Sequence, residues 1–545
     1  MFLSYRKVMV LTVLVGLALA AGGAYYWYQQ AIYTASLDTR PLKVGIVGEI
    51  DTLQPTQLDS PEERLLASAL YEGLVAYDER TSSIKPRLAR SWKYSADHKT
   101  LVVELKKVNF SNGQPLTAEK VKAAWEKSFS TTKDWANISL FLPIEGSQAR
   151  LEGRTPTIAG LEAVDSNTLR IRLEKPNSAF LHMLTNPIFW VYDEAETTDP
   201  SPGIGPFILQ ASTEDHTIVM TRNEKYHQGP PRLSALQFAL YAEPYQAFGD
   251  FKINKLDYLN QVPLTEIKNI KNNPDYKERL VERYLWETYS LGFNMNRAPY
   301  AGNYLLRRAL NYAIDRNAII ETVLAGSYRA AKGVIPMGMP GYNKQLRGYA
   351  YDPERAKELL AEAGYPGGEG LKPLLLSFNS DQGHRAVAEA IAQQLNQLGI
   401  DVQLQDMEWD YYKKQLNAMD LTLFRVGWHA DYADADNFLF GMFHSSKVGI
   451  SNYSAYNNPQ VDKILDAARA ETKSNEERLK LLQRAEEIIV DDAPMLWLFQ
   501  KKAAALSGEN VRHLEMDGLG MVDWFKAELL KPSANGEGSP SEEQV

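Results

Sequence analysis

The chain of 545 residues is predicted to fold as an α/β protein preceded by one apolar segment that enters a membrane. Strand patterns of period two alternate with amphipathic helix patterns from Leu42 to Leu530, and this alternation defines the fold class. No long linker and no internal repeat interrupts this stretch, so we expect tightly connected domains whose chain crosses between them. Hydrophobic residues make up 44% of the sequence, which is enough for a sizeable core.

The N-terminus carries the membrane prediction. A basic pair at residues 6–7 precedes an uncharged stretch that is mostly apolar over residues 8–28. Such a segment inserts with its basic flank inside, which sends the rest of the chain outward. The Ala-Leu-Ala at 18–20 is a candidate signal-peptidase site, whereas the Tyr-Tyr-Trp-Tyr at 25–28 is typical of the outer interface of an uncleaved span. We predict a signal or membrane anchor over 1–32, retained as a transmembrane helix, with a cleaved secreted form as the alternative.

The first half of the folded part contains clear strand patterns. Period-two alternation predicts strands at 42–50, 101–105 and 169–173. Between the second and third of these strands, Thr117 is a candidate N-cap for a helix that continues through Trp125. The change from strand to helix and back supports the α/β assignment.

The second half contains the clearest unit. A helix begins after Asp352, where a candidate N-cap is followed by proline, and ends at Gly364. A strand at 374–376 is followed by a helix whose apolar face extends over 387–398. A glycine ends that helix and the next strand covers 400–404, so these elements form a βαβ unit.

Charge and composition exclude several classes of function. The net charge is −9 and the lysines and arginines form no cluster, which argues against a nucleic-acid partner. The chain has no cysteine, which excludes disulfides, thiolate catalysis and Cys-ligated metal centres. A lipid anchor on a lipobox cysteine is excluded for the same reason, so anchoring by the apolar helix is the natural substitute.

Catalytic and metal-binding motifs are also missing. There is no G-x-S-x-G, no H-E-x-x-H and no P-loop, so we predict neither an enzyme nor a cofactor. Asp434 and Asp436 could begin a calcium loop, but Leu439 and Ser445 occupy the positions at which an EF-hand needs Gly and Glu. Paired carboxylates for glycoside hydrolysis stay open, since any Asp and Glu can meet in space, although no pattern supports them.

Several stretches resemble the solute-binding proteins of peptide ABC importers, the oligopeptide- and dipeptide-binding family. Each stretch alone is a weak signal, but together they follow the order of the family and cover most of 42–530. They are 70–74 (LYEGL), 85–92 (KPRLARSW), 108–121 (VNFSNGQPLTAEKV), 222–226 (RNEKY), 308–316 (RALNYAIDR), 427–432 (GWHADY) and 458–463 (NPQVDK).

The resemblance implies a two-lobed periplasmic-binding-protein (Venus-flytrap) fold of the α/β class with an extra inserted α/β domain. Lobe I is expected to be discontinuous, which agrees with the absence of linkers. The implied ranges are 40–70, 202–282 and 501–531 for lobe I, 71–201 for the extra domain, 283–500 for lobe II and 532–545 for a disordered tail.

The same resemblance implies the function. Members of this family bind peptides in an extended pose between the two lobes and deliver them to a membrane permease. The implied partners are a peptide ligand and an ABC permease with its ATPase subunits, and we expect a monomer at the extracytoplasmic face of the membrane. The alternatives are the same fold binding a nickel chelate, haem, a sugar or an opine, or a peptide sensor or chaperone.

Asp431 lies where the family places its carboxylate for the peptide α-amino group. A buried ammonium needs a paired anion, which suits this role, and a loop or helix-cap Asp is the alternative. Arg425 matches a family arginine near the ligand and could pair with a peptide carboxylate, or form a structural ion pair. Trp428 and Trp409 match aromatic pocket positions, with core packing the alternative for Trp409. His384 lies near a family histidine at the peptide C-terminal end, although its spacing to Trp409 differs by one.

The remaining candidates come from the same resemblance. His429 and Tyr432 belong to the stretch that contains Asp431. Asn294 falls where the family has a strand facing the cleft. Ser60 matches a loop whose backbone meets the ligand. The implied site therefore draws on both lobes.

Overall fold

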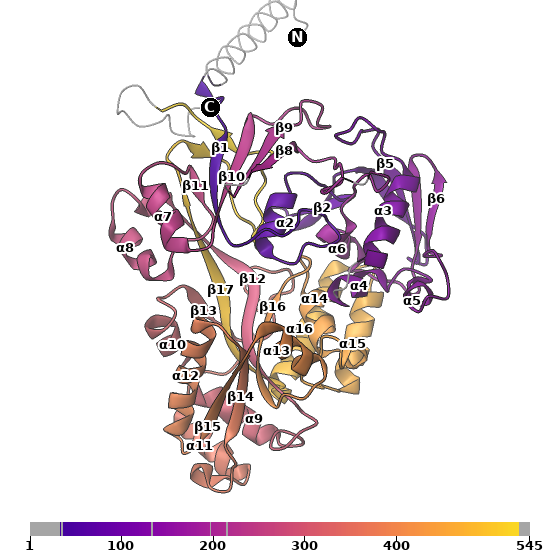
Figure 1. The fold of residues 1–545 in the computed structure, drawn as a ribbon. Helices are drawn as coiled ribbons and strands as arrows, with labels where there is room; N and C mark the ends of the chain where they lie inside the picture. The colour runs from indigo at the N-terminus through magenta and orange to yellow at the C-terminus, as the bar shows by residue number, and fades with distance from the viewer. Residues whose placement is uncertain (1–32, 34–35, 132–134, 197, 214–215, 533–545) are drawn as a thin grey trace, which may run out of the picture.

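The computed structural model describes residues 33, 36–131, 135–196, 198–213 and 216–532 (Figure 1). The anchor predicted over residues 1–32 lies outside the described residues, as does the predicted tail from residue 533 onward. Within the described ranges, no helix is long and apolar enough to cross a membrane.

An 11-stranded mixed sheet runs through the molecule. The strands of predicted lobe II occupy one end of it and those of lobe I the other, so a single sheet extends through both lobes. In spatial order the strands are β15 (Val402–Met407), β14 (Leu374–Asn379), β16 (Leu423–His429), β12 (Leu280–Phe293), β17 (Met495–Ser507), β11 (Tyr258–Leu259), β1 (Leu42–Val47), β10 (Ala235–Tyr241), β9 (Thr217–Arg222) and β8 (Phe207–Thr213), with β13 (Tyr328–Ala330) beside β17.

The long strands β12 and β17 connect the two halves of this sheet. They pair antiparallel over most of their length, with an irregularity between Tyr284 and Thr288. The implied limits between the lobes, at 282/283 and 500/501, fall inside these two strands. Figure 1 shows both strands running between the upper and lower halves of the molecule. Two paired strands therefore link the lobes, and the division of the chain into domains stays a prediction.

Lobe I is built around β1, the strand predicted from residue 42, which lies parallel to β10 and β11. Its C-terminal part returns to the first described residues, because Leu37 bridges to Leu530. The other elements of lobe I are α2 (Pro61–Ala67), α7 (Pro244–Lys252), α8 (Ile267–Asn272), β18 (Val511–Arg512) and β19 (Glu528–Leu529).

The extra domain has a sheet of its own, with the antiparallel order β4 (Ala89–Tyr94), β5 (Thr100–Leu105), β7 (Thr168–Arg172) and β6 (Leu161–Asp165). The predicted strands at 101–105 and 169–173 are β5 and β7, and the predicted helix is α3 (Ala118–Thr131). On α3, the fully buried Trp125 donates its indole N–H to the Phe189 carbonyl at 2.9 Å. The domain also contains β2 (Val75–Asp78), β3 (Ser83–Pro86), α4 (Trp135–Phe141), α5 (Ser147–Leu151) and α6 (Phe180–Met183).

Lobe II contains the predicted βαβ unit, in which β14 and β15 lie parallel on either side of α12 in the chain. The helix α11 begins as predicted, since the Asp352 side chain accepts the Arg355 N–H at 2.9 Å. Gly364 follows the helix with φ +93°, the left-handed region that favours glycine. The helices are α9 (Tyr304–Ala313), α10 (Arg316–Thr322), α11 (Pro353–Glu362), α12 (Gln382–Asn396), α13 (Trp409–Asn417), α14 (Ala435–Phe443), α15 (Pro459–Ala470) and α16 (Asn475–Asp492).

Candidate ligand-binding site

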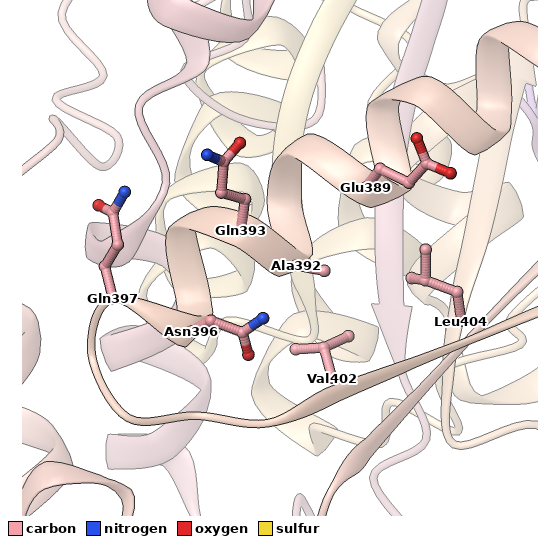
Figure 2. Close-up of a pocket in the computed structure, with 7 residues that line it drawn as sticks. All are labelled: Glu389, Ala392, Gln393, Asn396, Gln397, Val402 and Leu404. Atoms are coloured by element: carbon pink, nitrogen blue, oxygen red, sulfur yellow. The ribbon is translucent and has the colours of Figure 1, made fainter.

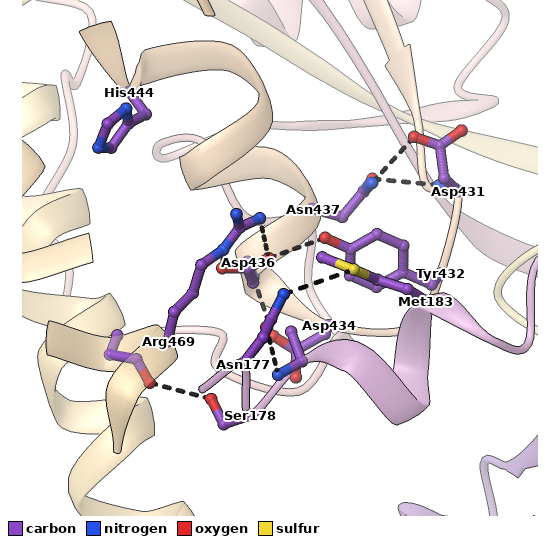
Figure 3. Close-up of polar contacts among 12 residues, drawn as sticks. Asn177, Ser178, Met183, Asp431, Tyr432, Asp434, Asp436, Asn437, His444 and Arg469 are labelled. Atoms are coloured by element: carbon purple, nitrogen blue, oxygen red, sulfur yellow. Dashed lines mark hydrogen bonds and ion pairs between the residues drawn. The ribbon is translucent and has the colours of Figure 1, made fainter. Parts of the chain in front are cut away.

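Asp431 lies in the loop that follows β16 and precedes α14, and a buried asparagine on α14 holds it (Figure 3). Asn437 donates its amide N–H to Asp431 Oδ2 at 2.9 Å, and its Oδ1 accepts the Asp431 backbone N–H at 3.1 Å. The same Oδ1 accepts the indole N–H of Trp428 at 2.9 Å. Asn437 is only 4% exposed, whereas Asp431 is half-buried. One side chain therefore orients both the candidate amine anchor and a candidate pocket aromatic.

The extra domain also reaches this loop. Asn186 donates its amide N–H to the Asp431 carbonyl at 3.0 Å, and it is itself 4% exposed. Asn186 Oδ1 accepts the backbone N–H of Ile188, which caps a short 3-10 turn at 187–189. The candidate anchor thus lies where lobe II meets the extra domain.

Tyr432 points away from the solvent, into the hydrophobic core of the extra domain. Its hydroxyl donates to Asp436 Oδ2 at 2.8 Å, and Arg469 donates two bonds to the same carboxylate, each of 2.8 Å. Burial, and then the Asp436 charge, raises the pKa of Tyr432 well above its usual value. The structure therefore gives Tyr432 a packing contact between domains, and its predicted contact with ligand stays a prediction.

A second group of polar residues lies on one face of the central strands, at the end nearest lobe I. Glu287 on β12 stands directly opposite His429 on β16, with His429 Nδ1 3.8 Å from Glu287 Oε2. Lys501 on β17 places its Nζ 3.3 Å from the same oxygen. Burial raises the pKa of Glu287, but Lys501 and then His429 outweigh it and lower that pKa to about 2.

A charge on α2 also acts on this group. The Glu287 carboxylate raises the pKa of Lys501 against the effect of burial, and Glu62 on α2 of lobe I adds a smaller contribution. Glu62 on α2 therefore lies within electrostatic reach of Lys501, the first residue beyond the implied limit between the lobes on β17. The Lys501 side chain is still 43% exposed, so water reaches it.

Arg425 and His384 belong to the same face. The Arg425 guanidinium lies 5.0 Å from the centre of the Tyr289 ring, and the His384 ring lies 5.4 Å from it. Burial, and then the Arg425 charge, lowers the pKa of His384 to about 4, so its ring is neutral at pH 7. Among the described residues Arg425 has no carboxylate within 4.0 Å, and its Nε is buried without a hydrogen-bond partner. The structural ion pair considered for Arg425 is therefore not formed within the described part of the chain.

Three predicted site residues lie apart from this group. Trp409 is the first residue of α13 and is 45% exposed, so it does not pack in the core. Asn294 is 1% exposed and donates to the carbonyls of Met419 and Leu421, beyond the end of β12 that is remote from His429. Ser60 caps α2, where its hydroxyl accepts one N–H and its own N–H donates to a glutamate. The predicted contacts of these three residues with ligand stay predictions. The observed contacts of Asn294 and Ser60 hold the protein's own backbone in place.

An open hollow lies on the outer edge of lobe II (Figure 2). It lies between α12 and β15, the edge strand of the large sheet, and contains none of the predicted site residues. The lining residues are Glu389, Ala392, Gln393, Asn396, Gln397, Val402 and Leu404.

The fold and this arrangement of charges define a two-lobed binding protein of mixed α/β class. Residues 83–449 match the family described as bacterial extracellular solute-binding proteins, family 5, middle region, and the chain belongs to that family. Its members are extracellular, which agrees with the outward orientation predicted from the N-terminal sequence.

Individual relatives extend the match over most of the chain. The chain is 30% identical over 452 residues to heme-binding protein A of Haemophilus influenzae, covering 78% of this chain and 81% of the relative. It is 26% identical over 514 residues to the oligopeptide-binding protein OppA of Bacillus subtilis, covering 90% and 92%. The solved structure of the Escherichia coli murein tripeptide binding protein MppA matches with a TM-score of 0.76 at 25% identity, covering 91% of this chain and all of that one. The predicted two-lobed fold is thereby confirmed.

Proposed function

We propose that this protein is the extracytoplasmic substrate-binding component of an ABC importer, which binds peptides between its two lobes and delivers them to a membrane permease. One observation carries the proposal: a fixed carboxylate, Asp431, and a cation, Arg425, that has no carboxylate partner among the described residues lie along the same strand and the loop that follows it. An extended peptide has one positive end and one negative end, so this pair complements it.

The spacing of the two groups limits the length of the ligand. Asp431 lies six positions after Arg425, which corresponds to at most roughly 20 Å between their Cα atoms along an extended chain. The chain turns after His429, so the true distance is shorter. Each residue of an extended peptide spans roughly 3.3–3.6 Å, so we propose extended ligands of about five residues or fewer between these two groups.

The direct test is calorimetry with a short peptide such as tri-alanine and with the same peptide after N-acetylation. We expect the free peptide to bind and the acetylated one to bind poorly, because acetylation removes the ammonium that Asp431 would pair with. Equal binding of both peptides would contradict the proposed role of Asp431. Binding of neither would favour a different solute.

Haem is the second candidate, because the relative that is 30% identical is named a heme-binding protein. The polar face offers two histidines, His384 and His429, that could approach a haem edge or iron. A titration of the protein with haemin, followed by its Soret absorbance, separates the two candidates. A saturable spectral shift at a stoichiometry of one, with no peptide binding, would favour haem.

We also propose that the N-terminal segment stays attached as a membrane helix. The motive is the aromatic cluster at 25–28 together with the absence of a lipobox cysteine. N-terminal sequencing of the protein from its native cells tests this, and a chain that starts near residue 21 would establish the cleaved form.

The binding protein is proposed to catalyse no reaction. Its role would be to release the peptide unchanged to the permease and its ATPase subunits. Mass spectrometry of tri-alanine recovered after a long incubation with the protein should show only the intact peptide, whereas fragments in proportion to the amount of protein would indicate a hydrolase.

A further inference from the structure

The extra domain is docked on lobe II at several points beside the candidate site. Ser178 donates its backbone N–H to the Arg469 carbonyl at 2.8 Å and its hydroxyl to the Ala468 carbonyl at 3.0 Å (Figure 3). The His182 ring approaches the buried Asp434 carboxylate to 3.9 Å. Together with Tyr432, which packs in the core of the extra domain, these contacts make a specific interface and not a loose approach.

Two buried asparagines from opposite sides of that interface hold the same residue. Asn437 of lobe II binds the side chain and backbone N–H of Asp431, and Asn186 of the extra domain binds its carbonyl. Both asparagines are 4% exposed, so water competes little for these bonds. Asp431 itself lies between the end of β16 and the start of α14, outside any strand or helix.

We propose that Asn186 is a positioning residue for the amine anchor: the extra domain, by docking on lobe II, fixes the backbone of Asp431 so that its carboxylate faces the ligand. This inference rests on the proposed function. It gives the extra domain a role in binding, because the ligand ammonium gains its full counter-charge only when the interface is formed. Peptide binding and docking of the extra domain are then coupled, each favouring the other.

The first test uses Asn186→Ser. Serine is a good N-cap, so its hydroxyl can still accept the Ile188 N–H, but it is too short to reach the Asp431 carbonyl. Loss of this buried bond should weaken binding of tri-alanine on the order of tenfold. N-acetyl tri-alanine does not use Asp431, so its weak binding should not change. A loss of affinity for the free-amine peptide alone would show that Asn186 acts by positioning Asp431.

Ser178→Ala is the matched control. It removes another bond between the extra domain and lobe II, but one that ends on Ala468 and not on Asp431. It should change the affinity for both peptides by the same small factor. Thermal unfolding of each variant checks that the fold is retained.

A second variant keeps the inference falsifiable if Asn186→Ser does not fold. Asn437→Ala removes the support on the lobe II side. Because Asn437 also holds Trp428, this variant should weaken binding of both peptides, but that of the free-amine peptide by the larger factor. Native-like affinity of the Asn186 variant for tri-alanine, or an equal loss for both peptides, would overturn the inference. Equal binding of both peptides by the native protein is a different result, because it would refute the amine anchor itself.

Discussion

The substitution Asp431→Asn removes the proposed counter-charge with the smallest change of shape. Asn437 donates to Asp431 Oδ2 at 2.9 Å, and the amide oxygen of the replacement can accept the same bond. The Asp431 backbone bonds to Asn437 and Asn186 do not involve the carboxylate. We therefore expect the fold and the orientation of the loop to be retained while the negative charge is lost.

The expected magnitude follows from the geometry of an ion pair. A peptide α-amine has a pKa near 8 and is mostly charged at pH 7. Two unit charges about 4 Å apart attract by about 4 kcal/mol at an effective dielectric constant of about 20. Because Asp431 is half-buried and not fully desolvated, we expect a loss of about 2–4 kcal/mol. This corresponds to a Kd that rises roughly thirty-fold to several-hundred-fold.

The assay is calorimetry of both proteins with tri-alanine and with its N-acetyl form. The two changes remove one interaction, so the acetylated peptide should lose little further on Asp431→Asn. Asp420→Asn is the matched control, because Asp420 pairs with Arg297 on an exposed surface at 2.8 Å. Unchanged tri-alanine affinity in the Asp431 variant, or an equal loss with both peptides, would refute the reasoning.

Three further results are expected. Arg425→Gln should weaken the binding of tri-alanine by about tenfold or more, because a charged hydrogen bond contributes about 1.5–3 kcal/mol. Binding of C-terminally amidated tri-alanine should not change, and equal losses for the two peptides in calorimetry would contradict this. The stabilisation from Glu287, whose pKa is lowered to about 2 from 4.5, should be complete above pH 4.5 and lost as the pH falls toward 2. Urea unfolding of the native protein and of Glu287→Gln should show a stability difference that shrinks over this pH range. A stability difference independent of pH would exclude the proposed contribution of Glu287. Saturating peptide should close the lobes and reduce the radius of gyration in small-angle scattering, whereas identical profiles would count against closure.

Local signals in the sequence were sufficient for individual elements of the fold. The N-cap at Asp352 marks the start of α11 and Gly364 marks its end. The period-two and period-3.6 patterns of 374–404 define the βαβ unit. The connection between the lobes was not visible in this way. The strand pattern of β12 and β17 does not change where one lobe ends and the other begins, so the implied limits fell inside these strands.

The candidate site could be predicted only in part. Asp431 and Arg425 could be proposed because they lie within, or two residues before, the recognisable stretch at 427–432. Asn186 was missed because it lies 245 residues from the Asp431 carbonyl that it binds, and no local pattern encodes a contact between two domains. Asn437 lies only six residues after Asp431, in the first turn of α14, so its proximity was the one available signal.

Lys501 and Glu287 show the same limitation on one face of the sheet. They meet because β12 and β17 are neighbours, although 214 residues separate them in the chain. For Trp409, exposure of 45% excludes the core-packing alternative, whereas its predicted contact with ligand stays a prediction. Side-chain environment depends on packing between distant segments, which composition and periodicity do not specify.

The most direct measurement is the identity of the ligand carried by the protein from its native cells. The protein is purified without unfolding, then denatured, and the released small molecules are analysed by mass spectrometry and by haem absorbance. The proposed function predicts a mixture of short peptides with free amino termini, about five residues or fewer. Release of stoichiometric haem or of another non-peptide solute would contradict the assignment of this protein as a peptide-binding component.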